Sequence, residues 1–285
     1  MRLFNRRTQL LIGKLGQKGT LIEYARISFD IEMNDKRETN TGTIQVWNLS
    51  QEVMNIFDDK DISVILKIGY GEEDPSIIYI GNIIEFKHDY QGVDLITSIT
   101  LKDGFIPLAN RRLSLSFAGG SSTKQIINKI VADLNFTKND YSDLSDFVYR
   151  QGFSFVGSPS QALDIVLARI GYEWTIANNV LIISKNNKTS KTVEAQLLKK
   201  ETGLLDSPQR IKQKATKRVA GSNVRDTKNL DGWLVKSLIL SGLIPKNLIK
   251  VESQTATGVF LIKQVRFVGD THADNWQAEM EVIEK

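Results

Sequence analysis

The sequence contains one three-strand pattern twice. Residues 62–103 show a short strand, a polar turn, a long strand, a second turn and a third strand, and residues 247–284 repeat this order in degenerate form. A chain that carries the same all-β half twice is expected to build two barrels of one kind. Duplicated barrels favour a ring-like or tubular assembly over a catalytic pocket.

The strand predictions depend on apolar residues at every second position. In the first copy, Ile62, Val64, Leu66 and Ile68 share a face opposite Ser63 and Lys67, and Val93, Leu95, Ile99 and Leu101 share a face opposite Asp94, Ser98 and Lys102. In the last strand, Trp276, Ala278, Met280 and Val282 alternate with Gln277, Glu279 and Glu281. This one-sided burial is typical of antiparallel sheets with one face on a core. Gly92 is predicted to supply the positive φ of a tight hairpin turn.

Composition sets the broad class. The chain has 285 residues, of which 41% are hydrophobic, so it can bury a sizeable core and allows two or three domains. Its 37 basic and 33 acidic residues give a net charge of +4, which is too small to indicate nucleic-acid binding by the whole chain. It has no cysteine, which excludes disulfides and thiolate chemistry. The apolar stretch at residues 10–12 is too short for a signal peptide, and no run approaches the roughly 20 apolar residues of a spanning helix.

We predict a mainly β chain with an α+β middle module, divided into residues 1–108, 109–190 and 191–285. The first region has further strands at 21–33 and 42–47 and a short helix at 51–57 that Ser50 caps. The middle region is a small α/β domain. It has one helix after the capping box at 122–125 and a second between Ser158-Pro159 and Gly171, and a hairpin turns at Asn178-Asn179. The first helix is predicted to bury Ile126, Ile127, Ile130, Val131 and Leu134.

The search for catalytic chemistry finds no site. His88 and His272 have no second histidine or carboxylate at metal-ligand spacing. We expect His88 to lie at a strand end and His272 to lie in a solvated hairpin loop. No serine or threonine lies in a nucleophile elbow, and the acidic run at 72–74 fits a soluble turn. Gly119-Gly120 lacks the spacing of a phosphate-binding loop. We therefore expect no catalytic residue, no metal site and no cofactor.

One basic run has two interpretations. Residues 210–231 are predicted to form a solvated loop with five cations near its start: Arg210, Lys212, Lys214, Lys217 and Arg218. Such a loop can hold phosphates through salt-sensitive contacts, so contact with DNA or with an acidic partner surface stays open. No aromatic residue lies between Arg210 and Leu230 to stack on bases.

The ordered motifs of the chain resemble phage baseplate or tail hub proteins. The first half carries IQVWNLS at 44–50, ISVILKIGY at 62–70, IYIGNI at 78–83 and ITSITLKDG at 96–104, and the second carries LILSGLIPKNLIKVES at 238–253 and GVFLIKQVRFVGDTHADNW at 258–276. The motifs are structural ones, namely Gly69, Tyr70, Gly81, Asp103, Gly104, Gly269, Asp270 and Trp276.

The resemblance implies two tail-tube-like β-barrels in each chain and a homotrimer. Three such chains would present six quasi-equivalent barrels, which can join a six-fold tail tube to a three-fold central spike. The implied partners are the tail tube protein, the central spike protein and other baseplate proteins, with transient contact of the 210–231 loop with DNA or the tape-measure protein. The implied location is the virion tail baseplate, after synthesis in the host cytoplasm.

Two other functions are compatible with the sequence. The basic run favours a nucleic-acid-binding β-barrel protein, which would show salt-sensitive affinity for DNA. Abundant carboxylates leave open a tail-associated cell-wall hydrolase. Our prediction is a structural, non-enzymatic virion protein that forms part of the DNA ejection conduit.

Overall fold

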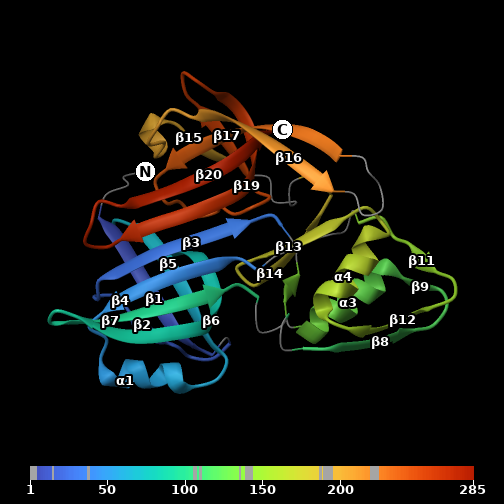
Figure 1. Ribbon diagram of the computed structural model, residues 1–285, viewed down its shortest axis with the longest axis horizontal. Helices are drawn as coiled ribbons and strands as arrows, with labels where there is room; N and C mark the ends of the chain where they lie inside the picture. Colours follow the sequence, from blue (N-terminus) through green and yellow to red (C-terminus); the bar gives the residue numbers. More distant parts are fainter. Residues whose placement is uncertain are drawn as a thin grey trace.

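The chain is described by a computed structural model. It covers residues 5–14, 16–36, 39–104, 108, 111–134, 136–138, 144–185, 188, 195–218 and 225–285. For residues 212–218 and 225–231, only the course of the backbone is described. Figure 1 shows a large β structure on one side and a smaller module of helices and short strands on the other.

The elements follow in three groups. The first contains β1 (Arg6–Lys14), β2 (Thr20–Ile22), β3 (Ile27–Asn34), β4 (Thr41–Trp47), α1 (Gln51–Met54), the 3₁₀ helix η1 (Asn55–Asp58), β5 (Ile62–Tyr70), β6 (Ser76–Gln91) and β7 (Asp94–Lys102). The second contains β8 (Leu113–Phe117), β9 (Ser121–Ser122), α3 (Thr123–Leu134), β10 (Thr137–Lys138), β11 (Val148–Tyr149), β12 (Phe153–Gly157), α4 (Pro159–Ala168), β13 (Glu173–Ala177) and β14 (Val180–Ser184). The third contains β15 (Gln196–Leu198), η2 (Lys200–Thr202), β16 (Gln209–Arg218), β17 (Arg225–Ser237), β18 (Leu248–Glu252), β19 (Thr257–Asp270) and β20 (Trp276–Glu284).

The internal repeat is confirmed, and it is longer than the sequence pattern indicated. The spatial order β3-β4-β7-β6-β5 in the first half recurs as β16-β17-β20-β19-β18 in the second, with every one of these pairs antiparallel. The long strand of each copy has a bulge at the same point, between Ile83 and Glu85 in β6 and between Ile262 and Gln264 in β19. We call each set of five strands a unit.

The two units belong to one sheet. Strand β3 pairs antiparallel with β19, so the strands form one 13-stranded sheet whose main path runs from β16 to β2, and β15 joins β18 in parallel. The predicted pair of closed barrels is therefore not found, because the described path is open at both ends and the units are joined edge to edge. The prediction of a mainly β, antiparallel chain is confirmed.

Two hydrophobic clusters divide the described residues. One draws on both units and includes Leu66, Ile99, Val265 and Met280, and the other includes residues of the middle module together with Leu108. This agrees with a separate core for the α/β module, while the exact boundaries at 108 and 190 stay predictions.

The helix and turn predictions that depend on short sequence motifs are confirmed. Helix α3 buries all five predicted residues, and α4 begins with a capping box at Ser158. Asn178 and Asn179 both adopt positive φ, as the predicted hairpin turn requires. In the first unit, Ser50 caps α1 through the Val53 N–H, and Gly92 has φ of 65°.

The sequence analysis needs correction at four places in the strands. Val93 is 96% exposed because it lies in the turn after Gly92, outside β7. The segment 21–33 is broken between β2 and β3. Residues 6–14, where no strand was predicted, form β1 between β2 and β5. Within the predicted loop at 210–231, residues 210–218 and 225–231 belong to the long antiparallel strands β16 and β17, whose polar composition hid their strand character. No helix among the described residues is long and apolar enough to cross a bilayer.

Candidate functional site

Four motif residues meet where the two units join. Trp276 Nε1 donates to the Tyr70 hydroxyl at 2.9 Å, and both side chains are buried. Phe29 of β3 packs edge-on against the Trp276 ring at a centroid distance of 5.6 Å. Gly269 leaves room for the Phe29 ring, because a Cβ there would overlap it. We call this region, with Arg26 and Asp270, the unit joint.

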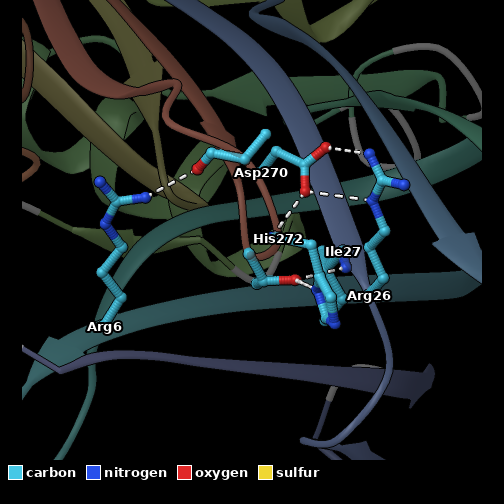
Figure 2. A network of polar contacts seen from close by, with 7 residues as sticks. Arg6, Arg26, Ile27, Asp270 and His272 are labelled. Atoms are coloured by element: carbon cyan, nitrogen blue, oxygen red, sulfur yellow. Dashed lines mark hydrogen bonds and ion pairs between the residues drawn. The ribbon is translucent and has the colours of Figure 1, made fainter.

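Asp270 fastens the polar side of the unit joint. Its carboxylate accepts two hydrogen bonds from the Arg26 guanidinium, at 2.8 and 3.2 Å, and a third from the His272 N–H at 2.8 Å (Figure 2). The side-chain hydrogen bond from Arg26 lowers the pKa of Asp270 and raises that of Arg26. Arg26 also lies 4.3 Å from the Trp47 ring centroid, and Arg6 donates to the Ala273 carbonyl at 2.9 Å. The joint therefore holds the β19–β20 loop against β1 and β3.

Loss of the buried hydrogen bond at the unit joint should be measurable. We expect Trp276→Phe to destabilise the chain by about 1–3 kcal/mol, because it leaves the Tyr70 hydroxyl buried without this donor. In a double-mutant cycle with Tyr70→Phe, urea unfolding should show a coupling of about 1 kcal/mol. Additive effects of the two substitutions would show that the hydrogen bond does not couple the units.

Asp103 connects the first unit to the middle module. It is fully buried, and its two carboxylate oxygens accept the backbone N–H groups of Asn178 at 2.6 Å and Asn179 at 3.0 Å. Asn178 in turn accepts the Ile80 N–H at 3.0 Å through its side chain. Burial raises the pKa of Asp103 to about 7, and hydrogen bonds from Asn179, Asn178, Asn40 and Gly104 oppose this rise. We call this region the module joint.

The other motif residues of the module joint give close packing. The Tyr79 hydroxyl donates to the Asn40 carbonyl at 3.2 Å, and Asn40 Nδ2 donates to the Ile176 carbonyl at 2.6 Å. A Cβ at Gly81 would meet the Tyr79 ring and one at Gly104 would meet Ile176, so both glycines permit contact that a side chain would block. Burial raises the pKa of Tyr79 well above its ordinary value, so the phenol stays protonated. Gly69 makes none of the contacts described for either joint, and a Cβ there would lie 3.0 Å from the Cα of Pro75.

A buried charge cluster, which the sequence did not reveal, lies at the end of the β3–β19 pairing opposite the unit joint. Lys246 is 1% exposed and has φ of 71°, and its Nζ lies 3.0 Å from Asp35 Oδ2. Lys263 Nζ contacts the same oxygen. Asp35 is therefore the carboxylate that both ammonium groups share.

The basic residues of the predicted loop lie on β16. Arg210 is exposed, and Lys212, Lys214, Lys217 and Arg218 follow it in the same strand. In the register, Lys212 is opposite Asp231 and Lys217 is opposite Asp226. The hairpin from 209 to 237 still has eight basic and only two acidic residues. The positive charge of the whole chain is thus concentrated in this hairpin.

The histidines do not form a site with each other. His88 contacts Thr97 Oγ1 at 2.9 Å and packs edge-on against Phe57, and His272 contacts Thr271 Oγ1 at 2.9 Å. Within the described part of the chain, no group of three or more His, Asp or Glu residues could hold a metal ion.

This architecture defines the class of the chain: two edge-joined five-strand units with a separate α/β module inserted between them. No known protein-family profile matches the sequence. No curated protein matches it either.

Solved structures of phage tail proteins have this fold. A tail protein from Neisseria meningitidis MC58 has a TM-score of 0.65 at 11% identity, covering 99% of this chain and 97% of its own. The 43 kDa tail protein of prophage MuSo2 from Shewanella oneidensis has 0.62 at 12% identity, covering 98% of each chain. An Escherichia coli component of the type VI secretion system, described as similar to T4 bacteriophage tail proteins, has 0.59 at 13% identity, covering 96% of this chain and 76% of its own. The resemblance seen in the sequence is thus confirmed as a shared fold.

Proposed function

We propose that the chain is a structural, non-enzymatic baseplate hub of a phage tail or a related injection particle. It assembles as a homotrimer, binds the tail tube protein, the central spike protein and other baseplate proteins, and forms part of the DNA ejection conduit. Each unit corresponds to one tail-tube-like element, so three chains present six units. The proposal is supported by the shared fold with tail proteins and, most directly, by the free edges of the two units.

The junction within the chain shows what the free edges can bind. The first strand of unit one, β3, pairs with residues 264–270 of the long strand of unit two, β19. The equivalent long strand of unit one is β6, and its residues 85–91 pair only with β7 among the described strands. The first strand of unit two is β16, and its partner among the described strands is β17 alone. The same junction can therefore form between β16 of one copy and β6 of the next.

The repeat also fixes the register of this proposed junction. In unit one, Asp30 of β3 lies opposite Thr43 of β4, which lies opposite Thr100 of β7. In unit two, Gln209 of β16 lies opposite Leu234 of β17, which lies opposite Glu281 of β20. Asp30 and Gln209 therefore occupy equivalent positions in the two units. The aligned bulges make Glu85 equivalent to Gln264.

Asn34 pairs with Gln264 and Glu32 pairs with Arg266. Transferred to the equivalent strands, this register places Glu85 opposite Gln213 and Lys87 opposite Ile211 of the next copy. Repetition of one head-to-tail junction closes a ring when the rotation permits.

The absence of cysteine allows a direct test of the ring. We expect the double variant Lys87→Cys with Ile211→Cys to form disulfide bonds between copies on mild oxidation, because directly opposed residues come within bonding distance. The product should be a covalent trimer with three times the chain mass, seen by non-reducing electrophoresis and light scattering.

The control pairs Lys87→Cys with a cysteine at Arg210, one residue out of register and on the other face of the strand. It should cross-link far more slowly, and each single variant should give no trimer. A double variant that stays monomeric, stops at dimers or links only within one chain would contradict the hub proposal. The hub proposal would also be contradicted if imaging of purified tails showed that they lack the protein.

The basic hairpin favours a second property, contact with DNA in the conduit. Its excess of six positive charges can bind phosphates by release of counterions. We expect weak binding of double-stranded DNA whose affinity falls steeply with salt. Replacing Lys212 and Lys214 by Gln should reduce the slope of log affinity against log salt by about one for each lysine. An unchanged slope would show that these lysines do not touch the backbone of DNA.

A further inference from the structure

The middle module has a hollow on the side away from the large sheet. It has a volume of about 670 Å³ and is lined by residues 147–154, which include β11, and by Ile165 and Arg169 near the end of α4. In Figure 1, β11 lies at the far right, and α4 lies between it and the β13–β14 hairpin that carries the module joint. The hollow is therefore free of the contacts that hold the module to the sheet.

Aromatic rings form the floor of the hollow. Phe147 packs edge-on against Tyr149 at a centroid distance of 5.0 Å, and Tyr149 packs against Phe153 at 5.2 Å. Two aliphatic side chains stand at the rim, Val148 and Ile165, each 51% exposed. Exposed aliphatic side chains next to packed rings are typical of surfaces that bind another protein.

The charge of the hollow has one sign. Arg150 and Arg169 are both exposed, and no acidic residue lines the hollow among the described residues. The Arg169 guanidinium lies 4.5 Å from the Phe147 centroid and 5.8 Å from that of Tyr149. No described carboxylate pairs with either arginine, unlike Arg26 and Arg266, which bind Asp270 and Asp30.

We propose that this hollow is a docking site for an extended, acidic segment of a partner protein, in which an aliphatic side chain lies beside a carboxylate. The aliphatic group would pack against Ile165 and the rings, where it removes apolar surface from water. The carboxylate would accept a bidentate pair from Arg169, whose guanidinium is already oriented by the ring beneath it. This site is independent of the hub proposal, because neither unit's free edge contributes to it.

The test begins with a library of random short peptides displayed on yeast and selected on the purified full chain. We expect the enriched peptides to combine Asp or Glu with Leu, Ile or Phe. A synthetic, labelled copy of the most enriched peptide is then titrated by fluorescence anisotropy. Arg169→Glu should weaken its binding by about tenfold or more, the loss expected for one charge-assisted pair, and Ile165→Ser should weaken it by a smaller factor.

The matched control is Lys18→Glu, which makes the same change in net charge at an exposed residue of the β1–β2 turn. It should leave the affinity within about twofold, because exposed charges at that distance are screened. Thermal unfolding of each variant checks that the module remains folded.

Three results would overturn the proposal. The first is a selection that yields no acidic peptides. The second is that the selected peptides bind the Arg169→Glu variant as tightly as the wild-type chain. The third is that the wild-type chain self-associates and Arg169→Glu abolishes this self-association. The last result would identify a second copy of this chain as the occupant.

Discussion

Asp35→Asn should destabilise the chain by about 3–5 kcal/mol, the cost of leaving a buried charge without its partner. The substitution preserves the shape of the side chain but removes the charge that Lys246 and Lys263 share. Lys246 cannot escape to solvent, because its side chain is only 2% exposed. Urea unfolding followed by tryptophan fluorescence measures the change.

Two control variants make the result specific to the buried charge. Lys246→Met should change stability by no more than about 1 kcal/mol, because it removes the excess charge and leaves Asp35 paired with Lys263. Asp30→Asn breaks an ion pair with Arg266 whose side chains are nearly half exposed, so it should cost less than about 1 kcal/mol. Equal effects of Asp35→Asn and Asp30→Asn would mean that the cluster is solvated.

The parts of the fold that the sequence could predict are those that local patterns determine. The five apolar residues of α3 recur at helical spacing, and Ser158 and Pro159 mark the start of α4, so the start of each helix was predicted. The alternation in β20 is complete because one face of that strand is buried along its whole length.

Strand β16 and the first half of β17 were missed because their side chains do not alternate between apolar and polar, whereas residues 232–240 show strand character in the sequence. A strand with polar side chains on both faces shows no alternation in hydropathy. Its Lys and Asn residues are also depleted in strands, so the sequence is interpreted as a loop. The same reasoning explains how the repeat was underestimated. Most of the first two strands of unit two showed no such alternation, so three of its five strands defined the pattern.

The two joints could be found only as motif residues without partners. Gly269 and Gly104 indicate a close approach, but nothing in the sequence shows that the approaching groups are Phe29 and Ile176. Asp270 and Arg26 are 244 positions apart, and their pairing follows from the β3–β19 junction. Sequence reasoning therefore named these motif residues and could not assign their contacts.

Asp103 should make the stability of the chain depend on pH. Burial raises its pKa in the folded chain to about 7, whereas an unfolded aspartate loses its proton near pH 4. The stability contributed by the bound proton is complete below about pH 4 and is lost as the pH rises to about 7. The loss is on the order of 4 kcal/mol for a shift of this size.

Asp103→Asn removes this titration and supplies the reference. At pH 4 the variant should be less stable than the wild-type chain by about 1–3 kcal/mol, because its amide NH₂ faces the N–H of Asn178 or Asn179. At pH 8 the order should reverse, because only the wild-type chain then buries a carboxylate without a cation. Urea unfolding of both proteins across this range, with Asp89→Asn as an exposed control, measures the crossing. A gap that widens with pH in favour of the wild-type chain would mean that the hydrogen bonds at the module joint outweigh desolvation, so that the carboxylate itself holds the module to the sheet.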